Sequence, residues 1–210
     1  MNPLLVDQLM QREPAYNICP TQNQPVIALG EDGYDLKALR WGLVPSWAKD
    51  LKIGGHAINA RQESVRKKPM FRSAFKNPKH RCLVPATGYY EWTGEAGSKQ
   101  PWFIYPPDHS LVIFAGLWEA WKDKADPEAD WVRTFTILTG EPGKVSGDIH
   151  DRQPVILPPE LWERWLTCTA DEAEALLAEV PEAELVYHPV TKAVSNPRSQ
   201  GEQLVEPIEL

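Results

Sequence analysis

Five short segments rich in apolar and aromatic residues constrain the fold of this chain more than any other feature. Runs of this length and composition are typical of β-strands, and loops such as Gly94-Glu95-Ala96-Gly97 separate them. Short loops join strands that run in opposite directions. The sequence therefore predicts a consecutive antiparallel meander made of residues 81–85, 88–92, 102–105, 111–118 and 132–139.

The other segments and the proline content set the fold class. Residues 26–29 are expected to form a strand with a hairpin partner over residues 36–43, and residues 159–166 and 170–180 are expected to form helices. Twenty prolines, many of them beside strands, favour short strands in a curled sheet over a doubly wound fold. At 210 residues, 42% of them hydrophobic, the chain has the size of one domain. We expect a single α+β domain over residues 1–210, with a curled, barrel-like antiparallel core flanked by short helices.

Composition and spacing exclude several classes of protein. No apolar run reaches the length of a membrane span, and the N-terminus lacks the basic-then-apolar order of a signal peptide. The cysteines, Cys19, Cys82 and Cys168, match neither a disulfide framework nor a metal spacing, and the histidines show no ligand spacing. The glycines form no phosphate-binding loop. We therefore expect a cytoplasmic protein with reduced thiols, no metal, no cofactor and no membrane partner.

The charges are unevenly distributed along the chain. The net charge of −7 alone argues against a polyanionic partner. Residues 61–81, however, contain eight basic side chains and a single acid, Glu63, whereas the acids concentrate in residues 123–184. A local basic surface on an acidic protein suits a nucleic-acid strand that is gripped at one place, although a solvated surface without a partner would have the same composition.

Glu91 is a candidate for proton transfer. It lies in the aromatic run Tyr89-Tyr90-Glu91-Trp92 on an expected strand. By alternation, Tyr89 and Glu91 face one side of that strand, and Tyr90 and Trp92 face the other. A carboxylate beside aromatic surface is partly desolvated, which favours its neutral form and suits it to acid–base work. An exposed glutamate at a strand edge is the alternative.

Two further stretches carry candidate site residues. His150 lies between Asp148 and Asp151, which can orient an imidazole and keep it basic. A surface histidine in an acidic turn is the alternative. Asn59 lies two residues before Arg61, whose planar guanidinium group suits a phosphate. A helix cap followed by a solvated arginine would look the same.

Trp47 is a candidate stacking surface. It ends the stretch Trp41-Gly42-Leu43-Val44-Pro45-Ser46-Trp47, a loop shaped by glycine and proline, in a chain with nine tryptophans. A ring in such a loop can stack on an unpaired base. A tryptophan that closes the core has the same sequence context.

Six motifs in a fixed order carry a resemblance to a known family. They are Tyr16-Asn17-Ile18-Cys19-Pro20-Thr21, Trp41-Gly42-Leu43-Val44-Pro45-Ser46-Trp47, Asn59-Ala60-Arg61, Arg81-Cys82-Leu83-Val84-Pro85-Ala86, Gly88-Tyr89-Tyr90-Glu91-Trp92 and Asp148-Ile149-His150-Asp151-Arg152-Gln153-Pro154. In this order the set resembles the SRAP family, the abasic-site processing proteins. The resemblance extends from about Tyr16 to Asn196-Pro197, which is essentially the whole chain.

The resemblance implies a compact α+β domain that binds single-stranded DNA carrying an abasic site and captures that site covalently. In the family, the α-amine of a cysteine that follows the initiator methionine attacks the sugar aldehyde, and its thiol closes the imine to a thiazolidine. By motif match, Glu91 is the acid/base at the amine and sugar, His150 assists ring opening and proton delivery, and Asn59 orients the adduct. The matched DNA-binding residues are Arg61 and Arg152 for flanking phosphates, and Trp47, Trp92, Pro20 and Thr21 for the path of the strand.

The start of the chain departs from the family pattern. The family begins Met-Cys-Gly-Arg, whereas this chain begins Met1-Asn2-Pro3-Leu4 with only 15 residues before Tyr16. We expect that a leading segment is missing, either because the start is placed too late, which we favour, or because the site is altered. Cys19 cannot replace the family's cysteine, since an internal thiol has no free amine beside it.

Three functions are therefore compared. The favoured one is an abasic-site processing protein that acts on single-stranded DNA as a monomer, in the cytoplasm and on the nucleoid when bound. The second is a single-stranded DNA-binding module without chemistry. The third is a cysteine-type autopeptidase, against which none of the three cysteines sits in a recognisable protease setting.

Overall fold

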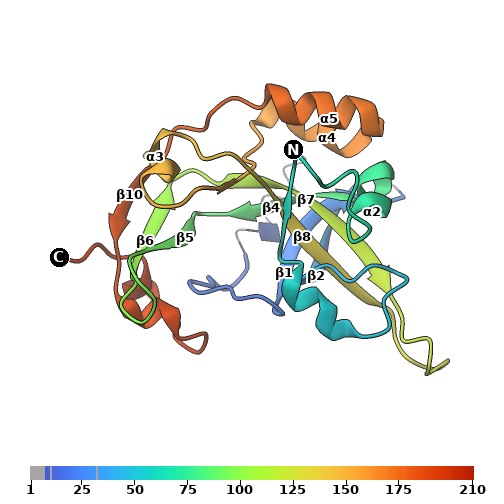
Figure 1. The fold of residues 1–210 in the computed structure, drawn as a ribbon, viewed down its shortest axis with the longest axis horizontal. Coiled ribbons are helices and arrows are strands. Elements are labelled where there is room, and N and C mark those ends of the chain that lie inside the picture. Colours follow the sequence, from blue (N-terminus) through green and yellow to red (C-terminus); the bar gives the residue numbers. More distant parts are fainter. Residues whose placement is uncertain (1–7, 10, 32) are drawn as a thin grey trace.

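Five strands close into a small barrel at the centre of the computed structural model, which describes residues 8–9, 11–31 and 33–210 (Figure 1). Around the barrel the strands follow the order β2-β1-β4-β7-β8, and each of these neighbouring pairs is antiparallel. A parallel pairing of β8 with β2, at Arg40–Thr134 and Trp41–Phe135, completes the ring. The barrel strands are β1 (Asn23–Leu29), β2 (Tyr34–Trp41), β4 (Arg81–Ala86), β7 (Val112–Trp121) and β8 (Val132–Gly140). The expected barrel-like core is confirmed.

Two short strands extend the barrel at the end of β8. β3 (Asn59–Arg61) runs parallel to β8, with Arg61 opposite Thr139. β9 (Gln153–Pro154) runs antiparallel to β8, with Pro154 also opposite Thr139. The segments around residues 60 and 153 are therefore brought to the same end of one strand, although they are far apart in the sequence.

The expected consecutive meander is wrong, because the five segments are divided between two sheets. β5 (Tyr89–Thr93) and β6 (Gln100–Tyr105) form a hairpin that pairs with β10 (Val186–Pro189) in a separate three-stranded sheet. β4 instead pairs with β1 and β7. Gly88 lies at the change of direction, where a Cβ atom would come within 2.6 Å of the Ile104 carbonyl oxygen. Its missing side chain lets β6 approach closely as the chain leaves the barrel.

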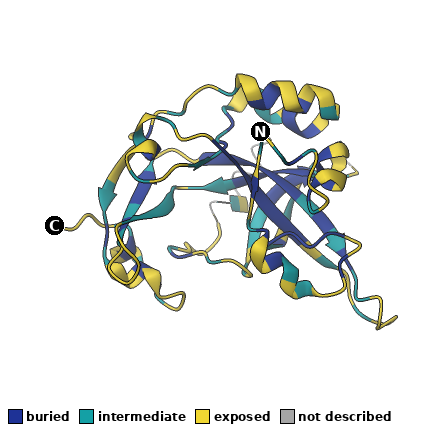
Figure 2. Cartoon of the chain, viewed as in Figure 1, coloured by how far each residue is buried: buried dark blue, intermediate teal, exposed yellow. Residues whose placement is uncertain are grey.

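Three helices pack against the barrel, with their exposed faces outward (Figure 2). They are α2 (Arg72–Lys76), α4 (Pro159–Thr167) and α5 (Ala170–Glu179). The two helices expected near the C-terminal end are confirmed to within one residue at each end. Pro159 begins α4, where its missing N–H costs nothing, and Thr169 caps α5 in a capping box with Glu172. A further short helix, α3 (Lys144–Gly147), and four 3-10 turns, η1 (Leu51–His56), η2 (Pro78–His80), η3 (Lys192–Ser195) and η4 (Glu202–Leu204), complete the described elements.

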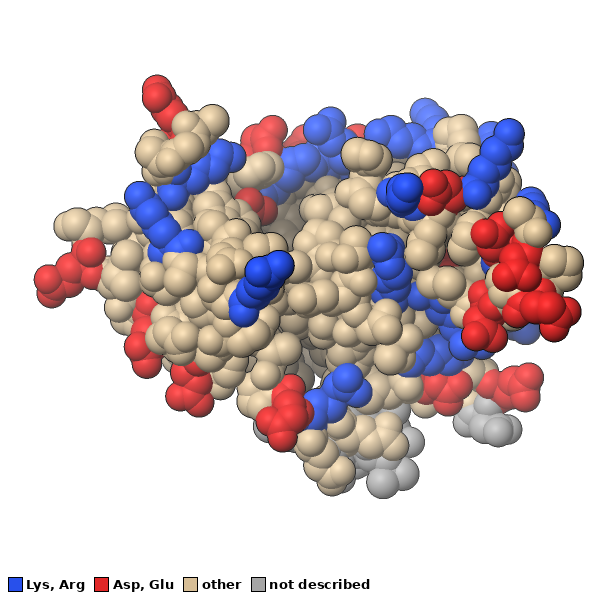
Figure 3. Space-filling view, turned by 90° about the horizontal axis from the view of Figure 1, so that it is seen from below, with Lys and Arg blue, Asp and Glu red and all other residues tan. Residues whose placement is uncertain are grey.

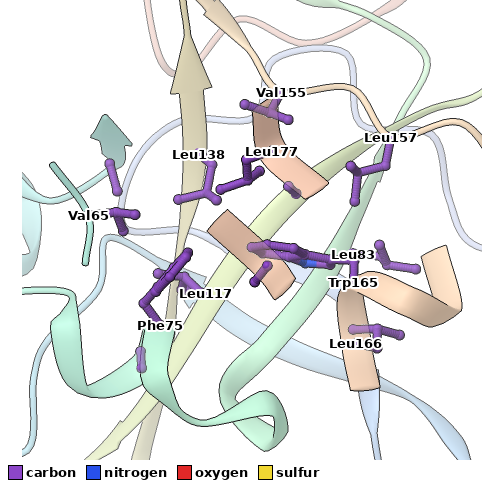
Figure 4. Packing of buried hydrophobic residues seen from close by; sticks show 14 of the residues in the cluster. Val65, Phe75, Leu83, Leu117, Leu138, Val155, Leu157, Trp165, Leu166 and Leu177 are labelled. Atoms are coloured by element: carbon purple, nitrogen blue, oxygen red, sulfur yellow. The ribbon is translucent and has the colours of Figure 1, made fainter. Parts of the chain in front are cut away.

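The main core lies between the barrel and these helices. Trp165 of α4 is fully buried at its centre, among side chains of β4, α2 and α5 (Figure 4). Arg81 is fully buried beside it, and its guanidinium donates to the carbonyl oxygens of Trp165 at 3.1 Å, Cys168 at 2.7 Å and Phe75 at 3.1 Å. The carbonyls of Trp165 and Cys168 belong to the end of α4, so a cation there is placed where helices favour positive charge.

Asn17 joins the two ends of the described chain. It is buried, and its side-chain amide donates to the carbonyls of Val194 and Asn196, at 3.0 Å in each case. The hydroxyl of Tyr90 donates to the Tyr16 carbonyl at 2.7 Å, so the segment before β1 is also fixed to the small sheet. The first residues, Met1-Asn2-Pro3-Leu4, lie outside the described residues. In the part of the chain that is described, no helix is long and apolar enough to cross a membrane.

Candidate active site

Glu91 is half-buried on β5, at one side of the small sheet. Burial raises the pKa of its carboxyl group above the usual value, the positive charge of His150 lowers it, and the negative charge of Asp151 adds a smaller rise. His150 is therefore close enough to Glu91 to influence its ionisation, although 59 residues separate them in the sequence. A desolvated carboxyl group beside an imidazole is suited to passing protons.

The two faces of β5 differ as strand alternation predicts. Tyr89 packs with the barrel-side core, whereas Tyr90 and Trp92 pack with Phe103 in another cluster. Trp92 donates from its ring nitrogen to Ser195 at 3.2 Å. Trp92 is therefore directed away from the side chain of Glu91 and contributes to packing between β5 and the C-terminal segment.

His150 lies in the loop that follows α3. Its backbone N–H donates to the Ser146 carbonyl at 2.8 Å. Its ring nitrogen Nδ1 lies 3.0 Å from a carboxylate oxygen of Asp151 and accepts a hydrogen bond from the Arg152 backbone at 3.1 Å. A protonated ring can donate to Asp151 and a neutral ring can accept from Arg152, so Nδ1 has a partner in either state. Within the described residues, Nε2 makes no hydrogen bond and is left for proton exchange.

The arginines differ in how freely they can meet a phosphate. Asn59 and Arg61 are exposed on β3. Arg152 instead forms a bidentate pair with Glu63, at 3.0 and 2.8 Å, and donates to the Thr139 carbonyl at 2.8 Å. These bonds to Arg152 hold the pKa of Glu63 below its usual range. Among the described residues Arg61 forms no ion pair, whereas Arg152 is already paired with Glu63.

The two loops expected to guide the DNA strand are held in place by hydrogen bonds to backbone carbonyls. Trp47 is 51% exposed, and its loop is fixed to β7 by the ring nitrogen of Trp121, which donates to the Ala48 carbonyl at 2.8 Å. Pro20 and Thr21 are exposed, and Thr21 has a φ of 76° while its N–H donates to Trp41 at 2.8 Å. An exposed ring on a rigid loop provides a stacking surface at low entropic cost.

The basic surface is smaller than the sequence suggests. Arg81 is buried in the core, and Arg66 is paired with Asp171 and Glu174 of α5. The remaining basic side chains of residues 61–81 are exposed: Arg61, Lys67, Lys68, Arg72, Lys76 and Lys79. Seen from below, basic side chains are spread over the middle of the face around a shallow hollow, and acidic ones stand mainly at its margins (Figure 3).

Two contacts near Glu91 and His150 have no signal in the sequence. The Tyr89 hydroxyl lies 2.7 Å from the Ser146 hydroxyl, and Glu63 neutralises Arg152. Each partner is distant in the chain, so composition and spacing cannot pair them. Among the described residues, no group of three or more His, Cys, Asp or Glu side chains could hold a metal ion.

The fold and this geometry define a class of protein: a small barrel with an added three-stranded sheet, whose edge strand carries a half-buried carboxyl group within the electrostatic influence of an imidazole. The comparisons with known proteins agree with this class. Residues 5–197 match the family described as SOS response associated peptidase (SRAP), and the chain belongs to that family.

Relatives are similar along nearly the whole chain. The abasic site processing protein YoqW of Bacillus subtilis is 37% identical, over 96% of this chain and 91% of its own length. The abasic site processing protein YedK of Escherichia coli is 30% identical, over 92% and 84%. A crystal structure of a Bacteroides thetaiotaomicron protein superposes with a TM-score of 0.77 at 26% identity, covering 90% of this chain and 82% of that one. The expected family and its α+β barrel fold are thus confirmed.

Proposed function

We propose that this protein binds single-stranded DNA containing an abasic site and reacts with that site through an imine, with Glu91 and His150 moving the protons. The observation that carries the proposal is the half-buried carboxyl group of Glu91 within electrostatic reach of His150. Relatives that cover nearly the whole chain are named abasic site processing proteins, which supports DNA as the substrate. The proposal places the protein in the cytoplasm, on the nucleoid when bound, as a monomer.

The first chemical step is opening of the abasic sugar. An abasic deoxyribose is a cyclic hemiacetal, which opens when its hydroxyl loses a proton and its ring oxygen gains one. A base and an acid on one site accelerate such a reaction. We assign His150 to deliver the proton to the ring oxygen because its Nδ1 has a partner in both protonation states.

The second step joins a protein amine to the aldehyde. The unprotonated amine adds to the carbonyl carbon, and the resulting carbinolamine loses water once its hydroxyl is protonated, which leaves an imine. Glu91, whose burial favours the protonated form, is the group suited to give that proton and recover it from the amine. Asn59, exposed on β3, is assigned to orient the adduct.

Exposed aromatic rings and cations indicate the path of the DNA strand over the surface. Trp47 is the more exposed of the two expected tryptophans and offers a stacking surface, while Pro20 and Thr21 stand at the surface beside the start of β1. Arg61 is free to meet a flanking phosphate. Arg152 can do so only by exchanging Glu63 for the phosphate, and Trp92 contributes through its packing.

A thiol-based peptidase using an internal cysteine has less support. Burial raises the pKa of the Cys19 and Cys82 thiols, so both favour the unreactive neutral form. Cys168 is buried and accepts a contact from Arg81 at 3.2 Å in the core. Among the described residues, none of the three cysteines forms a hydrogen bond with Glu91 or His150.

The proposal is tested by trapping the imine. A polypeptide that begins at Met1 and ends at Leu210 is incubated with a single-stranded oligonucleotide that carries one abasic site, with and without borohydride. We expect a covalent adduct only with borohydride, because an amine without an adjacent thiol cannot close the imine to a ring. A heat-stable adduct without reductant would identify another nucleophile, and Cys19 would be mutated first.

Substitution of the two proton-transfer residues separates the proposal from simple DNA binding. Glu91→Gln and His150→Asn are expected to slow adduct formation while leaving the affinity for undamaged single strands unchanged. Binding without any adduct, in the presence of borohydride, would instead establish a binding module without chemistry. Adduct formation at an unchanged rate in the double variant would exclude both residues from the chemistry.

A further inference from the structure

The segment that carries His150 depends on contacts from outside itself. Residues 143–152 contain only the four-residue helix α3 and the loop that follows it. A helix of one turn is not stable by itself in water, because the cost of nucleation exceeds what so few hydrogen bonds return. The position of the imidazole is therefore determined by whatever fixes this segment to the rest of the fold.

Arg152 holds the end of the segment through Glu63 and the Thr139 carbonyl. Before that end, three further polar contacts and two apolar side chains fix it. Glu182 accepts a hydrogen bond from the Lys144 backbone at 2.6 Å, and the Tyr187 hydroxyl lies 3.4 Å from Asp148. Both of these contacts are solvent-exposed. Val145 and Ile149 pack on the barrel-side core. The third polar contact, between the hydroxyls of Tyr89 and Ser146, is 2.7 Å long and partly buried.

The contact between Tyr89 and Ser146 connects the two halves of the site directly. Tyr89 is two residues from Glu91 on β5 and faces the same side of the strand. Ser146 is fully buried, and its carbonyl oxygen accepts the backbone N–H of His150 at 2.8 Å. This side-chain contact therefore joins β5, which carries Glu91, to Ser146, whose backbone is bonded to that of His150.

Its chemistry suits a permanent link. Burial raises the pKa of Tyr89 to about 12, so the phenol stays neutral throughout the range in which Glu91 and a histidine exchange protons. The ring also meets Phe114 edge-on, with centroids 6.0 Å apart, which fixes the direction of the hydroxyl. A hydrogen bond in a buried, packed setting holds its geometry better than an exposed one.

We propose that Tyr89 is a positioning residue, whose hydrogen bond to Ser146 holds the α3 segment so that the imidazole of His150 faces Glu91. The proposal rests on the proposed function for its catalytic meaning. It assigns Tyr89 no contact with DNA. Loss of the hydroxyl is expected to let the segment move while the fold and the DNA-binding surface stay intact.

The position of His150 is tested first, by nuclear magnetic resonance. Histidine side-chain nitrogen–proton correlation spectra are recorded for the unmodified protein, for Tyr89→Phe and for Ser146→Ala, with His150→Asn to assign the signal. The matched control is Tyr90→Phe, which removes a hydroxyl hydrogen bond of the same 2.7 Å length from the opposite face of the same strand. We expect the His150 signals to shift or broaden in the first two variants and to stay unchanged in the control.

The rate of borohydride-trapped adduct formation is the second measurement. Misplacement of a proton donor costs rate steeply, so we expect Tyr89→Phe and Ser146→Ala each to slow the reaction about tenfold at unchanged DNA affinity. The double variant should react no more slowly than either single variant, since both substitutions remove the same hydrogen bond. Tyr90→Phe should lower the melting temperature to a similar extent without this loss of rate.

The outcomes separate this inference from the proposed function. If the unmodified protein forms no trapped adduct, the proposed function fails, and the His150 spectra still decide whether Tyr89 positions the imidazole. Unchanged His150 signals in Tyr89→Phe would overturn the inference. So would equal rate losses in Tyr89→Phe and Tyr90→Phe, because that result would mark a general effect of destabilisation.

Discussion

The helix-covered core and the edge of the small sheet handle charge in opposite ways. In the core, the guanidinium of Arg81 is completely buried and donates to three backbone carbonyls. At the edge, Glu91 is only half-buried, and its pKa is raised by that burial. The guanidinium in the core is held by fixed hydrogen-bond acceptors, whereas the carboxyl group at the edge is desolvated, which favours its neutral form.

The largest expected effect tests the core side of this comparison. Arg81→Met retains much of the side-chain volume but leaves the carbonyls of Trp165, Cys168 and Phe75 without their donor. We expect a loss of about 3–5 kcal/mol in the free energy of unfolding, measured with urea. Arg66→Met is the control, because its pairs with Asp171 and Glu174 are exposed and worth less than about 1 kcal/mol. Equal losses in the two variants would contradict the assigned role of Arg81.

The next effect tests the site. Glu91→Gln keeps the shape of the side chain and removes its proton transfer, so the rate of borohydride-trapped adduct formation should fall by about 10²-fold. Glu95→Gln, at an exposed position in the loop after β5, should leave that rate unchanged. A similar rate in both variants would show that the carboxyl group of Glu91 takes no part.

A smaller effect concerns the free energy of unfolding, which Glu91→Gln is expected to raise rather than lower. Because burial raises the pKa of Glu91, the folded protein binds this proton more tightly than the unfolded chain, and stability falls as pH rises above the usual glutamate pKa of about 4.3. Glu91→Gln removes this cost. We expect it to stabilise the protein by up to about 1 kcal/mol at pH 7, and by nothing once the pH is below that value. Urea unfolding at both pH values measures the difference, and a variant less stable at pH 7 would show that the charged form is favoured by the fold.

The smallest effect concerns the paired arginine. Glu63→Gln leaves Arg152 without its carboxylate, so Arg152 becomes available to a phosphate. We expect single-stranded DNA to bind about threefold more tightly and the salt dependence to steepen by about 0.7, the value for one further phosphate contact. Glu128→Gln, an exposed change elsewhere on the surface, controls for net charge. Fluorescence anisotropy over a salt series measures both quantities, and identical results for the two variants would exclude Arg152 from the binding surface.

The strands and helices were predictable from local sequence, but their partners were not. Residues 81–85 and 88–92 look alike as strands, yet the first enters the barrel and the second starts another sheet. The choice depends on Gly88, which lets β6 come close, and on pairings with β1 and β7. Such contacts join residues far apart in the chain, and no local pattern records them.

The site was predictable to a similar extent. Alternation placed Glu91 and Trp92 on opposite faces of β5, and the motif around His150 marked its loop. The basic run was misleading, because Arg81 turned inward and Arg66 paired with α5. Composition gives the number of charges in a segment, but the packing of the whole chain decides which of them reach the solvent.

The amide of Asn17 also sets an order of events during synthesis. Its partner Val194 follows 177 residues later, so at roughly 5–20 residues per second the ribosome needs about 10 to 35 s to make it. Throughout that interval the side-chain amide of Asn17 lacks this partner. The segment before β1 therefore acquires all of its hydrogen bonds only when residues 194–196 have been made, so this part of the fold is completed last.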